Sequence, residues 1–159
     1  VTFCLSKGLA APVGSIICGS EKFIYEAKRL RKAFGGGMRQ AGIIASAGIY
    51  SLNNMIEQIK EDHNNAKALA TGINNINGLS IDVKNIKSNI LYFSIDGNKQ
   101  RSNKLAQLTK NINSYPYEIY IDDIKFFEGK PNIFRLVTHY GISSNDIEKI
   151  LSVLKNMIK

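Results

Sequence analysis

The chain has 159 residues, of which 44% are hydrophobic and 21% are charged, with a formal net charge of +8 at pH 7. These proportions are typical of a globular domain and exclude an intrinsically disordered chain. We find no apolar run near the roughly 20 residues of a membrane-spanning helix and no signal-peptide pattern at residues 1–10. Two cysteines make neither a disulfide framework nor a zinc site, so we expect a reducing cytoplasm.

The first third of the chain predicts two short strands and two helices, at residues 1–5, 13–18, 21–34 and 38–52. The first strand is expected to be buried, and a chain that opens inside a strand suggests part of a longer protein. Ser20 can cap the first helix, and three consecutive glycines at 35–37 end it. The second helix is apolar on nearly every side, which is typical of a buried helix.

Asn53 and Asn54 mark the predicted domain boundary, because the composition turns polar after them. The pattern then predicts helix, two strands, helix, three strands and helix, at residues 55–73, 79–83, 89–95, 103–112, 117–121, 124–127, 133–137 and from 143 onward. At the last helix, Ser143 and Asp146 have the spacing of a capping box. This order predicts an α+β unit whose small sheet is covered by helices on one face.

Lys7 is the first candidate functional residue. It follows a predicted buried strand and precedes Gly8, so we expect it beside an apolar interior, where desolvation disfavours the ammonium form. A lysine held in this way can form a Schiff base with an aldehyde cofactor. The alternative is an ordinary loop lysine.

Two arginines are further candidates. Arg39 stands at the start of the predicted apolar helix, where a cation opposes the helix dipole unless an anion such as phosphate is also bound. Arg135 lies in a strand-like run and could hold a carboxylate through two hydrogen bonds. The alternative for Arg39 is a surface arginine on a flexible connector, and the alternative for Arg135 is a strand residue that faces solvent. His63 and His139 do not cluster, and we expect structural roles for both.

Four ordered blocks resemble the low-specificity L-threonine aldolases, which are pyridoxal-phosphate enzymes of fold type I. The blocks are residues 3–15 (FCLSKGLAAPVGS), 29–42 (RLRKAFGGGMRQAG), 61–66 (EDHNNA) and 135–139 (RLVTH). Family members are longer, and the resemblance covers their C-terminal half. It implies an α/β protein in which residues 1–52 end the large cofactor domain. Residues 53–159 would form a small C-terminal α+β domain with an antiparallel sheet. Ala10 departs from the family, which usually has glycine there.

The resemblance also implies roles for individual residues. Lys7 would be the Schiff-base lysine of the pyridoxal phosphate, and Arg39 would approach its phosphate. Arg135 would clamp the substrate carboxylate, and Lys32 would lie near the active site across a subunit interface. The implied reaction is retro-aldol cleavage of L-threonine or L-allo-threonine to glycine and acetaldehyde.

The resemblance further implies a small amino acid substrate, a homotetramer, and neither a nucleic-acid nor a membrane partner. The family takes its stacking histidine and the acid partner of the pyridine nitrogen from the N-terminal half, so we expect this chain alone to be inactive.

Two alternatives remain open. One is another fold type I enzyme, such as a β-eliminating lyase, which would release ammonia and an α-keto acid. The other is a basic nucleic-acid-binding module, which would bind in a salt-dependent way. The basic residues do not gather with aromatic residues into a stripe, and this argues against the module.

Overall fold

The computed structural model describes residues 1–95, 117–121, 124–130 and 132–158. The chain divides into two compact units, Val1–Lys60 (unit 1) and Glu61–Lys159 (unit 2), and the division falls inside helix α3 (Ile56–Asn74). The helix predicted at 103–112 lies outside the described residues. The boundary predicted between residues 52 and 53 separates a large cofactor domain from a small C-terminal domain. The division into two compact units does not test it, so it stays a prediction.

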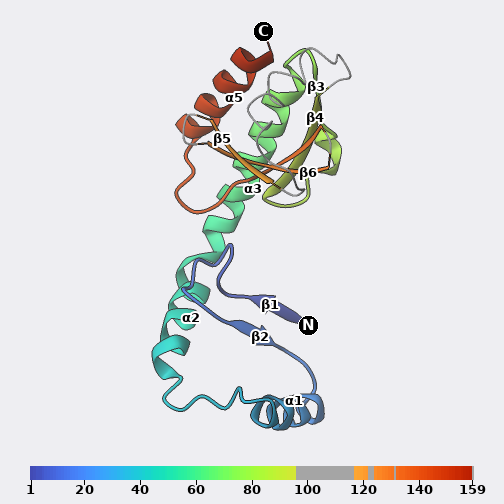
Figure 1. Ribbon diagram of the computed structural model, residues 1–159. Coiled ribbons are helices and arrows are strands. Elements are labelled where there is room, and N and C mark those ends of the chain that lie inside the picture. The colour runs from blue at the N-terminus through green and yellow to red at the C-terminus, as the bar shows by residue number, and fades with distance from the viewer. Residues whose placement is uncertain (96–116, 122–123, 131, 159) are drawn as a thin grey trace. The chain divides into compact units, whose positions relative to one another are not determined.

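Unit 1 begins with an antiparallel hairpin of β1 (Thr2–Cys4) and β2 (Ser15–Ile17) (Figure 1). The backbone of Leu5 closes the connecting loop, because its N–H donates to the Gly14 carbonyl (2.9 Å) and its carbonyl accepts from Ala11 (3.0 Å). The core of unit 1 is small and consists of Leu5, Leu9 and Ala11, packed against the partly buried Phe3, Ile16, Met55 and Ile59. The prediction of a buried strand over 1–5 is therefore wrong for most of its length, since only Leu5 is buried.

Helix α1 (Glu21–Ala33) begins and ends as the sequence predicts. The Ser20 hydroxyl accepts from the backbone N–H of Phe23 at 3.4 Å. At the other end, Gly36 donates to the Arg31 carbonyl (2.8 Å) and Gly35 to the Lys32 carbonyl (3.2 Å). This is the Schellman arrangement, in which the residue after the cap is left-handed, and Gly35 has φ +84°.

Helix α2 (Gly42–Asn54) differs from its prediction in two ways. It begins at residue 42 rather than 38, because Gln40 adopts the left-handed φ of +49° and interrupts helical geometry. It is also largely exposed, with only Gly48 and Ser51 buried and Ile43 80% exposed. Helix α2 is therefore apolar but exposed, because the small core of unit 1 covers only a small part of its surface.

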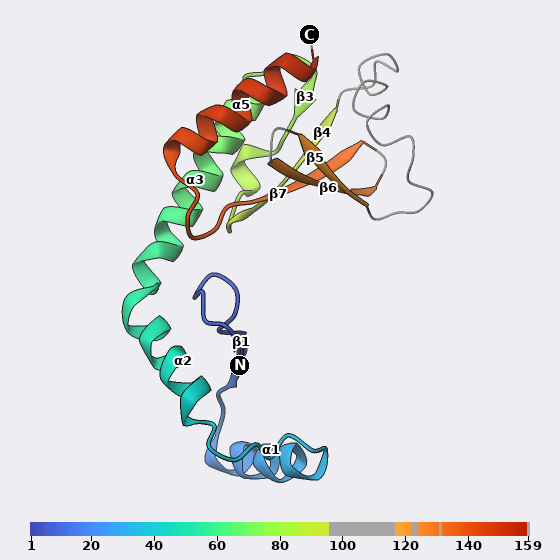
Figure 2. The same ribbon diagram turned by 60° about the vertical axis from the view of Figure 1, so that its left-hand side comes forward.

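Unit 2 contains a five-stranded antiparallel sheet in the order β3-β4-β7-β6-β5. The strands are β3 (Leu79–Ser80), β4 (Ile90–Ile95), β5 (Tyr117–Ile121), β6 (Ile124–Lys130) and β7 (Ile133–Val137), with a 3₁₀ turn at Val83–Asn85. Helices α3 and α5 (Ser144–Ile158) lie on one side of this sheet (Figure 2). For the residues that the structure describes, the predicted small sheet with helices on one face is confirmed.

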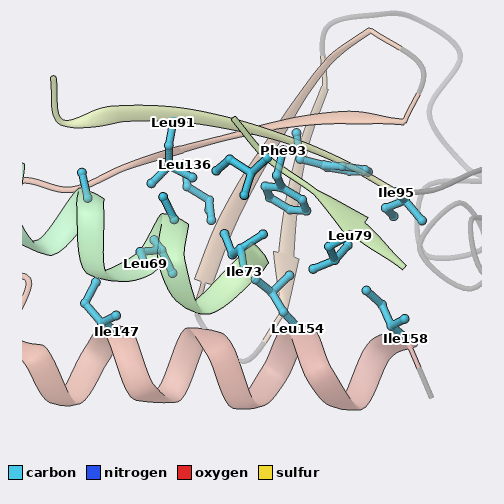
Figure 3. Close-up of a cluster of buried hydrophobic side chains, with 14 residues drawn as sticks. Leu69, Ile73, Leu79, Leu91, Phe93, Ile95, Leu136, Ile147, Leu154 and Ile158 are labelled. Carbon is cyan, nitrogen blue, oxygen red and sulfur yellow. The ribbon is translucent and has the colours of Figure 1, made fainter. Parts of the chain in front are cut away.

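The core of unit 2 fills the space between this sheet and the two helices (Figure 3). Alternate residues of β4 and β7 point into it, as the period of two in a strand requires. Phe93 and Phe134 are directly paired across these strands, and their rings stack with centroids 5.4 Å apart. The buried residues are Ala66, Leu69, Ala70, Ile73, Leu79, Ile81, Leu91, Phe93, Ile95, Phe134, Leu136, Ile147, Leu154 and Ile158.

The opposite face of the sheet carries the intervening residues of β4 and β7. Ile90, Tyr92, Ile133 and Val137 are all at least 37% exposed. We call this the open face of the sheet. In the described part of the chain, no helix is long and apolar enough to cross a membrane.

Candidate functional site

Lys7 lies at the tip of the loop that joins β1 to β2. Its carbonyl accepts from the N–H of Ala10 at 2.8 Å, which forms a tight turn. The flanking Leu5 and Leu9 are buried, whereas the Lys7 side chain is exposed. Lys7 therefore does not lie beside an apolar interior in unit 1, because the buried residues on either side turn toward the small core and leave the lysine outside.

The backbone of this loop needs unusual conformations. Gly14 has φ +125°, and a Cβ there would lie 3.2 Å from the Leu5 side chain. Ala10, which stands where the resembling family usually has glycine, has φ +55°. Alanine at a left-handed φ costs roughly 1–2 kcal/mol. The loop keeps the shape that a glycine would favour, even though alanine occupies the position.

Lys32 and Arg39 lie on either side of the three glycines. The Lys32 side chain lies along Gly37, where an added Cβ would be 2.9 Å from its Nζ atom. Arg39 is exposed and precedes Ala41, the N-cap residue of α2, which makes no side-chain capping hydrogen bond. The first-turn amides of α2 therefore have no side-chain acceptor from their cap residue. A guanidinium beside such amides is a donor set suited to phosphate.

Arg135 occupies the middle of β7, on the open face of the sheet. It is paired with Tyr92 of β4 on one side and with Phe127 of β6 on the other. Its side chain is half-buried, and its Nε atom is fully buried. The open face thus presents a guanidinium among partly exposed apolar side chains, where its attraction for an anion is stronger than in bulk water.

Thr138 anchors the end of β7, a role that sequence reasoning missed. Its hydroxyl donates to the Asp62 carbonyl of α3 at 2.6 Å, and its side chain is buried. Asn89 completes the anchor: its amide donates to the Thr138 carbonyl (2.6 Å) and its own carbonyl accepts from the Thr138 N–H (3.0 Å). The sequence signal for this anchor was weak: a small polar residue, Asn89, begins one predicted strand and another, Thr138, directly follows the other. This anchor ties the Arg135 strand to β4 and to α3.

The two histidines lie apart from any cluster of ligands. His63 is half-buried on α3, and the exposed His139 contacts the Tyr140 carbonyl through Nδ1 at 2.8 Å. Among residues that the structure describes, no three histidine, cysteine or acidic side chains are grouped so as to hold a metal ion.

A groove of about 640 Å³ lies between the C-terminal end of α3 and α5. Gly72 and Ile76 line one wall, and Leu151 and Ile158 line the other. It contains no predicted site residue and lies on the helical side of the sheet, away from Arg135. The predicted residues are divided between the units, with Lys7, Lys32 and Arg39 in unit 1 and Arg135 in unit 2.

Comparison with known proteins identifies relatives over nearly the whole chain. Residues 1–96 match the model of the beta-eliminating lyase family. The chain is 37% identical to low-specificity L-threonine aldolase 1 of Arabidopsis thaliana over 96% of its length. It is 36% identical to the low specificity L-threonine aldolase of Escherichia coli K12 over 94% of its length. In both cases it spans 40% of the relative.

Solved structures give the same fold. A putative L-allo-threonine aldolase from Listeria monocytogenes superposes with a TM-score of 0.66 and 18% identity, over 98% of this chain and 44% of that one. A serine palmitoyltransferase from Sphingomonas wittichii gives a TM-score of 0.63 with 16% identity and covers 98% and 38%. The predicted α/β fold, a part of a fold type I pyridoxal-phosphate enzyme, is confirmed. The chain belongs to the beta-eliminating lyase family and corresponds to the C-terminal portion of low-specificity L-threonine aldolases.

Proposed function

We propose that this chain contributes to a pyridoxal-phosphate-dependent carbon–carbon lyase that cleaves L-threonine or L-allo-threonine to glycine and acetaldehyde. The observation that carries the proposal is the 37% identity, over 96% of the chain, to a low-specificity L-threonine aldolase. Because the chain spans 40% of that relative, the activity is proposed for a protein that includes this chain together with the remaining part of the cofactor site.

The residues of unit 1 fit the cofactor chemically. When bound, pyridoxal phosphate supplies an electron sink for the pair released as the Cα–Cβ bond breaks. Lys7 offers an exposed primary amine on a loop held by backbone hydrogen bonds, and an amine is the group that reacts with an aldehyde. Arg39 and the first-turn amides of α2 offer charge and N–H donors for the phosphate.

Arg135 would hold the substrate carboxylate. A guanidinium matches a carboxylate through two parallel hydrogen bonds, and this fixes the orientation of the amino acid as well as its position. Orientation matters for this reaction because the bond that breaks must be aligned with the electron acceptor. Lys32 is proposed to lie near the active site of a neighbouring subunit in a homotetramer.

Reductive trapping tests the cofactor role of Lys7. The purified chain is mixed with pyridoxal phosphate, reduced with borohydride, digested and mapped by mass spectrometry, with circular dichroism to verify folding. We expect Lys7 to be labelled in preference to the other lysines. The variant Lys7→Arg should lose this labelling, whereas Lys67→Arg, an exposed lysine on α3, should not. Scattered labelling of a folded chain would mean that this chain by itself does not hold the cofactor at Lys7. The same trap on a protein that includes the rest of the cofactor site would then decide the role of Lys7, and scattered labelling there would overturn it.

A second candidate function is β-elimination, because the family that matches residues 1–96 is named for that reaction. The two reactions release different products, so one assay separates them. With a protein that includes this chain and the rest of the cofactor site, acetaldehyde from threonine supports the aldolase. Ammonia with an α-keto acid supports elimination.

A further inference from the structure

Tyr92 stands directly opposite Arg135 in the antiparallel pair of β4 and β7. Residues opposite each other in such a pair project from the same face, with Cβ atoms about 4.5–5.5 Å apart. The neighbours Leu91 and Phe93 of β4 point into the core. Tyr92 therefore shares the open face with Arg135, the residue proposed to hold the substrate carboxylate.

The hydroxyl of Tyr92 is available for a ligand. The side chain is 55% exposed, and it makes no hydrogen bond with any residue that the structure describes. Packing on the open face would require only the ring, so the hydroxyl has no structural task there. Ile90, Ile133 and Val137 surround the pair with partly exposed aliphatic surface. A polar group in such surroundings gains more from binding an anion than it would in open water.

We propose that Tyr92 is a second substrate-binding residue, whose hydroxyl donates a hydrogen bond to the carboxylate held by Arg135. This inference rests on the proposed function, which assigns the carboxylate to Arg135. An ionised carboxylate has about four lone-pair sites, and a bidentate arginine uses two of them. About two acceptor sites of the carboxylate therefore remain, and one of them can take a donor from the adjacent strand. The class of ligand is a small amino acid bound through its carboxylate.

The test is an NMR titration of the isotopically labelled chain with L-threonine and, as the matched ligand, threoninol, which lacks the carboxylate. We expect threonine to shift resonances of β4 and β7 and threoninol to leave them unchanged. The Tyr92→Phe variant should bind threonine about three- to tenfold more weakly, the loss expected for one hydrogen bond to a charged group at a partly exposed site. Arg135→Gln should abolish the carboxylate-dependent shifts.

Tyr140→Phe is the control, because Tyr140 is similarly exposed (62%) but lies beyond the end of β7. Its affinity for threonine should equal that of the unmodified chain. If Tyr92→Phe also binds with unchanged affinity while Arg135→Gln does not, the role of Tyr92 is overturned and that of Arg135 stands. If Arg135→Gln has no effect, or if threonine and threoninol act alike, the carboxylate role of Arg135 is overturned as well.

Discussion

The loop that carries Lys7 holds one residue in a conformation that does not suit it. Ala10 has φ +55°, where the Cβ of alanine crowds the following carbonyl oxygen. Replacement by glycine removes this strain but adds backbone entropy to the unfolded chain. We expect Ala10→Gly to raise the free energy of unfolding of unit 1 by roughly 0.5–1 kcal/mol. Urea titration followed by circular dichroism measures the change.

Ala11→Gly is the matched control for this loop. Ala11 is buried, and its φ is not left-handed, so the glycine loses contacts and gains no relief of strain. It should lower the free energy of unfolding. If Ala10→Gly were also destabilising, the left-handed conformation at residue 10 would not be a source of strain.

The Thr138 hydroxyl joins β7 to α3 through a single buried hydrogen bond. Thr138→Val keeps the shape of the side chain but leaves the Asp62 carbonyl without this donor. The Asp62 carbonyl lies inside α3 and keeps its helical hydrogen bond, so we expect a loss of about 0.5–1.5 kcal/mol of stability, the usual net contribution of one hydrogen bond. Thr138→Ser keeps the hydroxyl and should lose less. Thermal unfolding of both variants gives the comparison, and equal losses would mean that packing, rather than the hydrogen bond, holds the strand end.

At the scale of single elements, the start of α5 links stability to pH. The Ser143 hydroxyl and N–H both donate to the Asp146 carboxylate, at 2.6 and 2.8 Å. These hydrogen bonds hold the pKa of Asp146 below its ordinary value, with a smaller contribution from Lys149. A depressed pKa means that the stabilisation is present above the ordinary value of 3.8 and is lost as the pH falls through the folded-state pKa.

We therefore expect the first turn of α5 to fray in acid while the rest of the helix persists. Hydrogen exchange at the amides of residues 143–147, measured between pH 6 and pH 3 and corrected for the intrinsic rate, would show protection falling below pH 3.8. In Asp146→Asn the protection should be lower at pH 6 and should no longer depend on pH in this window. An unchanged pH profile in that variant would contradict the role of the carboxylate.

The sequence predicts elements well where both sides of a contact lie in the same unit. The alternating apolar residues of β4 and β7 and the apolar face of α5 were recognised in the sequence, and their side chains pack together in the core of unit 2. The apolar pattern of α2 predicts a buried helix equally clearly, yet α2 is exposed, because a pattern shows which side chains are apolar and not what covers them. The late start of α2 depends on the backbone of Gln40, which no propensity of glutamine indicates.

The residues of the candidate site also divide into those that the sequence indicates and those that it does not. Lys7, Arg39 and Arg135 were candidates from the local pattern, and the resemblance of their blocks to a family added Lys32 and gave all four their roles. Thr138 and Tyr92 were not candidates, since their positions depend on strand register. Tyr92 comes opposite Arg135 only when β4 pairs with β7, and β7 lies about 40 residues further along the chain. A local pattern carries no information about that pairing.

At the scale of the whole molecule, the two units have very different cores. The core of unit 1 consists of three buried residues, whereas at least fourteen form that of unit 2. Because burial of apolar surface is the main stabilising contribution, unit 2 should unfold at higher urea concentration than unit 1. Native-state hydrogen exchange should show the strongest protection at residues 66–73 and in β4, and weak protection in α1. Equal protection in both units would contradict this order.

The exposed apolar surface of unit 1 has a consequence for the chain in solution. Phe34 and Ile43 are at least 80% exposed, and Phe23, Tyr25, Leu30, Ile49 and Tyr50 are more than half exposed. Monomeric proteins rarely leave so many large apolar side chains exposed on neighbouring helices, because water is excluded when such surfaces meet. We expect the isolated chain to associate through α1 and α2, with an apparent mass in sedimentation velocity that rises with concentration.

Substitutions on α2 can show whether apolar contact or attraction between charges causes this association. The double variant Ile43→Gln and Ile49→Gln removes apolar surface without changing the net charge, and we expect it to shift association to at least about tenfold higher concentration. Lys67→Gln changes a charge on the exposed side of α3 and should leave association unchanged. Association driven by apolar surface should persist or strengthen in high salt, whereas attraction between charges would weaken. If the double variant associates as strongly as the unmodified chain, the apolar face of α2 is not the contact surface.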